Sequence, residues 1–168
     1  MNNYIIGILV SNLSGVLSRV SGMFTRRCFN IDSLTVGETD SSEFSRITIA
    51  FHGTSHDKEQ IVRQLEKLYD VKEIEVLDEH NSVIRELALI KIRNTEESRS
   101  AIMTAVEVFR SKIVDYSPTT LVCELTGELS KINAFIELVR PYGIIEMDRT
   151  GIVAVERGEN CLKTEAAD

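Results

Sequence analysis

The apolar residues of this chain follow one order of predicted elements twice, and this repeat restricts the folds open to it. In residues 1–77, alternating apolar positions predict strands and three-to-four-residue spacing predicts helices, in the order βαββαβ. Residues 83–158 follow the same order, in pattern and not in residue identity. This order is the split βαβ unit of ferredoxin-like folds. The sequence therefore predicts an α+β protein of two ferredoxin-like βαββαβ domains, with a polar linker at 78–82 and a polar tail at 159–168.

The individual elements are placed by apolar spacing and by turn residues. One helix is expected to begin at Val16 and another near Ser130, and Asp57 and Thr95 are expected to be the N-caps of the other two. A tight turn at 150–151 is expected to join the last two strands. The predicted strands are 4–10, 31–38, 46–51, 71–77, 83–92, 112–116, 119–126, 144–148 and 152–155.

A short polar turn at residues 12–19 joins the first predicted strand to the first helix. Free backbone N–H groups and the helix dipole give such a turn partial positive charge, which favours a carboxylate or phosphate. The segment contains no His, Cys, Asp or Glu, so we expect it to bind a ligand and not to catalyse a reaction. Local pattern alone leaves open that Gly15 and Asn12 are only turn residues.

The first strand is apolar on both faces, because Ile6 and Ile8 alternate with Ile5 and Leu9. A sheet with helices on one face and apolar residues on the other favours self-association. The same pattern equally fits a strand that is buried on both sides within one domain.

Composition excludes several classes of function. The 168 residues carry a net charge of −7 and both halves are acidic, so no nucleic-acid partner is expected. No apolar run approaches the roughly 20 residues that span a bilayer, so we expect no membrane partner and a cytoplasmic location. Cys28, Cys123 and Cys161 form no CxxC pair, and His52 and His56 do not share a helical face, so no metal site is expected.

Two segments carry a resemblance to a known family. Residues 12–19 read NLSGVLSR, and residues 27–37 read RCFNIDSLTVG. Together they resemble the ACT domain, a βαββαβ module that binds amino acids, as it occurs in the small regulatory subunit of acetolactate synthase (acetohydroxyacid synthase). Residues 45–48 (SRIT) and 109–115 fit the same family, and the resemblance covers about residues 1–158.

The resemblance implies a regulatory subunit with no catalytic site of its own. It implies an ACT domain at 1–77 that binds the effector and forms a homodimer, and a ferredoxin-like domain at 83–158. The partner would be the large catalytic subunit, which carries thiamine diphosphate, Mg and FAD and takes part in valine, isoleucine and leucine biosynthesis. This chain would hold no cofactor. It would activate that subunit and confer allosteric feedback inhibition by valine or another branched-chain amino acid.

The family's effector site maps onto two separate parts of the sequence. The expected effector-binding residues are Asn12, Gly15, Val16, Leu17, Asn30 and Ile31. A helix of roughly 20 Å would separate the turn from Asn30 within one chain, so we expect the site to be completed across a dimer. One residue departs from the family: Cys28 stands where glycine is usual, at a helix end that would favour a left-handed conformation.

Two other classes of function compete with this interpretation. A free-standing ACT-type sensor of amino acids, acting on a different enzyme, would not need the second half to match. A small independent enzyme would need a nucleophile–base pair, paired carboxylates or a phosphate-binding loop, and the sequence offers none of them.

Overall fold

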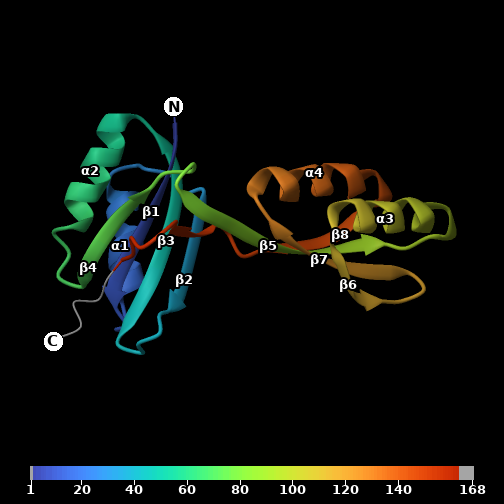
Figure 1. The fold of residues 1–168 in the computed structure, drawn as a ribbon, viewed down its shortest axis with the longest axis horizontal. Helices are drawn as coiled ribbons and strands as arrows, with labels where there is room; N and C mark the ends of the chain where they lie inside the picture. The colour runs from blue at the N-terminus through green and yellow to red at the C-terminus, as the bar shows by residue number, and fades with distance from the viewer. Residues whose placement is uncertain (1, 163–168) are drawn as a thin grey trace. The chain divides into compact units, whose positions relative to one another are not determined.

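The computed structural model describes residues 2–162 and contains two compact units (Figure 1). Among these residues, the first unit contains 2–83 and 152–162, and the second contains 84–151. Each unit has its own sheet and its own apolar core. The predicted α+β class with two βαββαβ-like units is confirmed. None of the helices in the described residues is long and apolar enough to cross a membrane.

The first unit is a four-stranded antiparallel sheet with two helices on one face (Figure 1). The strand order is β2-β3-β1-β4. Side chains from β1, β3 and both helices form a single core that includes Ile6, Ile8, Phe24 and Phe51. The elements are β1 (Asn2–Ser11), α1 (Val16–Arg26), β2 (Ser33–Glu38), β3 (Phe44–Gly53), α2 (Ser55–Leu65) and β4 (Val71–Leu77).

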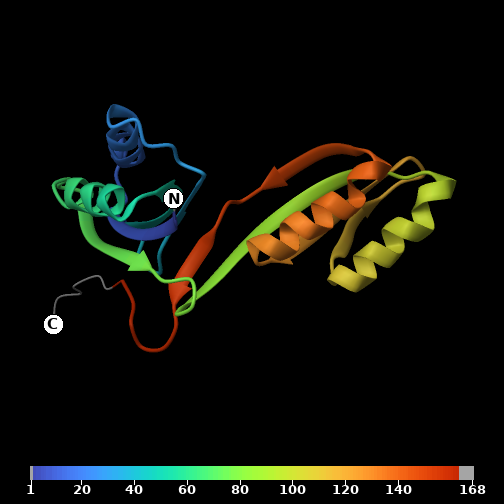
Figure 2. The same cartoon turned by 90° about the horizontal axis from the view of Figure 1, so that it is seen from above.

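The second unit repeats this plan, and its two helices lie on the same face of its sheet (Figure 2). The strand order is β6-β7-β5-β8, and β9 also pairs with β5. The elements are β5 (Ser82–Arg93), α3 (Glu96–Phe109), β6 (Lys112–Tyr116), β7 (Thr120–Gly127), α4 (Leu129–Val139), a 3₁₀ turn (Arg140–Tyr142) and β8 (Ile144–Arg149). The last strand, β9 (Val153–Glu156), lies among the residues of the first unit.

The helix starts confirm one predicted cap and correct another. Thr95 caps α3 as expected, and its hydroxyl accepts from the Ser98 N–H. The N-cap of α2 is Thr54 and not Asp57, which occupies the third helical position and completes a capping box. Hydrogen bonds from the backbone and side chain of Thr54 lower the pKa of Asp57, because they favour its charged form.

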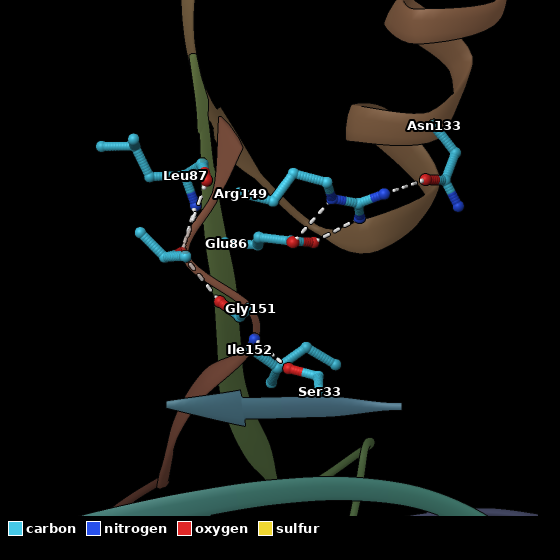
Figure 3. A network of polar contacts seen from close by, with 8 residues as sticks. Ser33, Glu86, Leu87, Asn133, Arg149, Gly151 and Ile152 are labelled. Atoms are coloured by element: carbon cyan, nitrogen blue, oxygen red, sulfur yellow. Dashed lines mark hydrogen bonds and ion pairs between the residues drawn. The ribbon is translucent and has the colours of Figure 1, made fainter. Parts of the chain in front are cut away.

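The turn expected at 150–151 does not reverse the chain. β8 and β9 both pair with β5, so Thr150 and Gly151 interrupt a strand that continues along its partner. The Thr150 N–H donates to the Leu87 carbonyl over 3.0 Å, and its hydroxyl accepts from the Leu87 N–H over 3.1 Å (Figure 3). Residues 152–158 lie within the predicted domain at 83–158, and in the structure they group with the first unit.

The second apolar face of β1 is covered within the chain. Ile5 and Leu9 are 2% and 3% exposed, and β9 packs against β1 and β4. The interpretation as a strand buried on both sides is therefore confirmed, and this face gives no support for self-association.

A buried ion pair joins two strands of the second unit to a helix. Glu86 on β5 is 4% exposed, and both its oxygens accept from Arg149 on β8, over 2.8 and 2.6 Å (Figure 3). Arg149 also donates to Asn133 on α4 over 3.3 Å. The bidentate pair raises the pKa of Arg149, because it favours the charged guanidinium.

Candidate effector-binding site

The turn before α1 leaves the start of that helix without a side-chain cap. Gly15 is the N-cap residue, with φ +83°, in the left-handed region that glycine adopts without steric cost. The first turn of α1 contains no acidic residue, and no side chain accepts from its N–H groups. α4 also begins without a side-chain cap, whereas α2 and α3 begin with complete capping boxes. The Val16 N–H donates to the Leu13 carbonyl over 3.4 Å, and the N–H groups that follow it in the first turn remain suited to a bound carboxylate.

The side chain of Asn12 ties this turn to the loop between β2 and β3. Its Nδ2 donates to Glu38 Oε1 over 2.8 Å and to the Ser42 carbonyl over 3.0 Å. Its Oδ1 accepts from the Ser45 hydroxyl over 3.1 Å. Asn12 therefore shapes the turn in this state, and a ligand that bonds directly to its amide must displace one of these partners or share it.

Arg19 places a positive charge beside the turn, which sequence reasoning had not assigned to the site. It forms an ion pair with Asp70, with atom separations of 2.8 and 2.7 Å. One of its guanidinium nitrogens lies 3.3 Å from the position that a Cβ on Gly15 would occupy. Arg19 lies within the 12–19 motif, but no sequence signal connects it with Asp70, which is 51 positions away.

The predicted apolar contacts divide between core and surface. Val16 is 3% exposed and packs in the core of the first unit, so its side chain anchors the turn to that core. Leu17 is 42% exposed beside the helix start, where its side chain is accessible to a ligand.

Asn30 and Ile31 lie beyond the other end of α1. This helix has 11 residues, which gives a length of about 16 Å. Asn30 Nδ2 donates to Asp32 Oδ1 over 3.4 Å, and the other oxygen of Asp32 lies 2.6 Å from Nδ1 of His52. One copy of the chain therefore does not bring Asn30 together with Gly15.

Cys28 adopts the conformation that glycine usually supplies at a helix end. Its φ is +57°. Its N–H donates to the Thr25 carbonyl over 3.1 Å, and the Phe29 N–H donates to the Phe24 carbonyl over 3.1 Å. This pair of bonds is the Schellman motif, and Phe29 and Phe24 meet in the same apolar core. The helix therefore ends as it would with glycine, and cysteine bears the strain.

The Cys28→Gly variant is expected to be more stable than the parent by about 0.5–1 kcal/mol. The gain comes from relief of left-handed strain on Cβ, partly offset by the greater freedom of glycine in the unfolded chain. Urea unfolding followed by circular dichroism measures it. Cys28→Ala is the matched control, because it removes the thiol and keeps Cβ; an equal gain in that variant would show that the thiol, and not the backbone, is the cause.

Comparisons with known proteins agree with this fold. A model of the acetohydroxyacid synthase (AHAS) small subunit-like ACT domain matches residues 6–73, and a model of the small subunit of acetolactate synthase matches residues 85–158. The chain is 44% identical over 162 residues to a probable acetolactate synthase small subunit of Methanothermobacter thermautotrophicus, covering 96% of each protein. It is 45% identical over 155 residues to the acetolactate synthase small subunit of Bacillus subtilis, covering 92% of this chain and 90% of that protein.

A solved structure extends the similarity to the whole fold. The crystal structure of the acetolactate synthase small subunit from Thermotoga maritima is 40% identical and matches with a TM-score of 0.88, over 95% of this chain and all of that one. Both halves of the sequence match the family, and the relatives are covered over nearly their full lengths. The chain therefore belongs to the acetolactate synthase small-subunit family.

Proposed function

We propose that this chain activates the catalytic subunit of acetolactate synthase and confers feedback inhibition by a branched-chain amino acid, with valine as the first candidate. Membership of the small-subunit family implies a catalytic large-subunit partner. We further propose that thiamine diphosphate, Mg and FAD reside on that partner in the cytoplasm, and that this chain contributes regulation and no catalytic group.

The observation that carries the effector proposal is the uncapped start of α1 at Gly15. A free amino acid presents a carboxylate, which suits the N–H groups and positive end of a helix. Arg19 adds a cation beside that position, and Leu17 offers an exposed aliphatic surface for a branched side chain.

The separation of Asn30 from this turn supports a shared site. About 16 Å of helix lies between the two groups, a distance that a single valine cannot bridge. We therefore propose a homodimer in which the turn at Gly15 comes from one chain and Asn30 and Ile31 come from the other. The amide oxygen of Asn30 would accept from the ammonium group of the effector.

Calorimetry on the isolated chain with valine, leucine and isoleucine tests the proposal. We expect valine to bind and the other two to differ from it by about 1–3 kcal/mol, because one methylene contributes about that much. Sedimentation of the same sample is expected to show a dimer. Failure of all three amino acids to bind would leave only the role of activating the partner, and pyruvate condensation by the chain alone would contradict the regulatory role.

A further inference from the structure

Residues 152–162 cover the face of the first unit's sheet that α1 and α2 leave open. We call this segment the C-terminal strap. Ile152 and Ala154 in the strap are 5% and 4% exposed, and β9 packs against β1 and β4. At its start, the Ile152 N–H donates to Ser33 Oγ on β2 over 2.8 Å (Figure 3). The strap is thus held against the sheet by both apolar and polar contacts.

Arg46 on β3 binds the strap at the centre of this face. Its guanidinium donates to the Ala154 carbonyl over 2.8 Å. Gly7 on β1 leaves the necessary space, because a Cβ there would lie 2.8 Å from Arg46 and 3.1 Å from Leu162 of the strap. Arg46 lies in segment 45–48, which fits the acetolactate synthase small-subunit family. In this structure its side chain holds the C-terminal strap on the sheet.

The docked strap leaves Arg46 and Glu75 incompletely paired. Glu75 lies beside Arg46 on β4, but their closest nitrogen and oxygen are 3.7 Å apart, too far for a hydrogen bond. Arg46 Nε and Glu75 Oε2 are both buried without a hydrogen-bond partner among the described residues. Removal of the strap would free Arg46 Nη2, which now donates to the Ala154 carbonyl, and a turn of the guanidinium that brought Nε to Glu75 Oε2 would pair both buried atoms.

Glu75 and Glu156 of the strap line the same cavity, and the interaction between their carboxyl groups raises the pKa of Glu75 and lowers that of Glu156. Two carboxylates have no hydrogen to donate, so a hydrogen bond between them requires a proton on one of them. Glu156 Oε1 accepts from Asn81 over 2.8 Å. Glu156 is therefore stabilised in its charged form, and Glu75 is the carboxyl that carries the proton.

The surroundings of Glu75 favour this protonated form. Burial, the hydrogen bond to Glu156 and the charge of Glu156 raise the pKa of Glu75 from 4.5 to about 6, with Arg46 opposing them. Glu73 on β4 adds negative charge in the same direction. Glu73 and Glu159 join the pair in lining a cavity of about 370 Å³. Ionisation of Glu75 thus adds one more negative charge to a group of carboxylates.

We propose that Glu75 and Glu156 form a proton-dependent latch that closes the C-terminal strap on the sheet, and that opening of the latch lets Arg46 pair directly with Glu75. Docking binds a proton, because Glu75 has a higher pKa with the strap closed than the ordinary 4.5. The stabilisation of the docked strap by this proton is fully present below about pH 4.5 and is lost as the pH rises through about 6.

Hydrogen exchange of the full-length chain at pH 5.0 and 7.5 tests the latch. Exchange times are scaled for the intrinsic pH dependence of amide exchange, and the readout is protection of peptides from 152–162. A pKa that moves from 4.5 to about 6 predicts that wild-type protection falls about eightfold between these two pH values. Equal protection at both pH values would overturn the proposal.

Two isosteric variants separate the latch from general effects of pH. Glu75→Gln keeps a hydrogen-bond donor toward Glu156 without a charge, and Glu156→Gln supplies a donor toward Glu75. Both are expected to keep the strap protected at pH 7.5 and to remove the pH dependence. Glu66→Gln, at the exposed end of α2, loses the same charge and should behave as wild type. The latch would be contradicted if protection of the strap still fell eightfold between the two pH values in both latch variants. It would also be contradicted if either variant lost protection of the strap at both pH values.

Discussion

In acetolactate synthase reconstituted with a Gly15→Asp small subunit, we expect the catalytic rate to remain raised while valine no longer lowers it. Gly15 has φ +83°, so any side chain there is strained, and a Cβ would lie 3.3 Å from Arg19. Aspartate would also place a negative charge at the helix start where we propose that the effector's carboxylate binds. Together these effects should raise the half-inhibitory valine concentration by at least about tenfold, equivalent to about 1.4 kcal/mol.

Gly22→Asp is the matched control for that experiment. Gly22 lies within the same helix, and a Cβ there would meet nothing within 4 Å. The control adds the same charge and is expected to keep both activation and valine sensitivity. Valine titrations of the carboligation rate measure both variants against wild type. Wild-type valine sensitivity in Gly15→Asp would remove the turn from the effector site, whereas loss of activation would indicate damage to the partner interface.

Apolar periodicity predicts most of this fold, because each strand and helix buries one regular face. The strands predicted at 71–77 and 112–116 match β4 and β6 residue for residue. The core that the side chains of β9 join was not predictable in this way. β9 pairs with β5 in the five-stranded sheet, yet Ile152 and Ala154 are buried and their segment groups with the first unit, and no periodicity in the sequence indicates which core these side chains join.

The site is less fully predictable, because its polar contacts join residues that are distant in sequence. The turn at Gly15 has a local signature, and the structure gives it the left-handed glycine that a sharp entry into α1 requires. The bonds of Asn12 to Glu38 and Ser45 depend on the β2–β3 loop returning to the turn. Asn30 cannot be placed against the turn from one chain at all, so its role rests on the proposed dimer.

The largest expected loss of stability comes from Arg149→Leu, which should reduce the free energy of unfolding by about 3–5 kcal/mol. Glu86 is 4% exposed and receives two hydrogen bonds from Arg149. The substitution would leave a buried carboxylate without its cation, and would also remove the contact from β8 to Asn133 on α4. Most domains have only about 5–15 kcal/mol of stability, so the second unit should unfold at a much lower urea concentration.

Arg140→Leu provides a control with the same substitution on the surface. Arg140 pairs with Glu137 at 2.7 Å, nearly the distance of the buried pair, but both side chains are more than 60% exposed. Water already solvates these charges, so the expected cost is only about 0–1 kcal/mol. Similar losses in the two variants would show that burial of Glu86 does not set the cost.

The double variant Glu86→Leu/Arg149→Leu distinguishes an unpaired charge from lost bonding. If the cost in Arg149→Leu arises from the isolated carboxylate, removal of Glu86 as well should recover most of the stability, because an apolar pair avoids burying any charge. If it arises from the lost hydrogen bonds, the double variant should be at least as unstable as the single one. Urea unfolding of wild type, both single variants and the double variant gives the coupling energy directly. We expect recovery, since the bidentate pair at this position compensates mainly for the burial of Glu86.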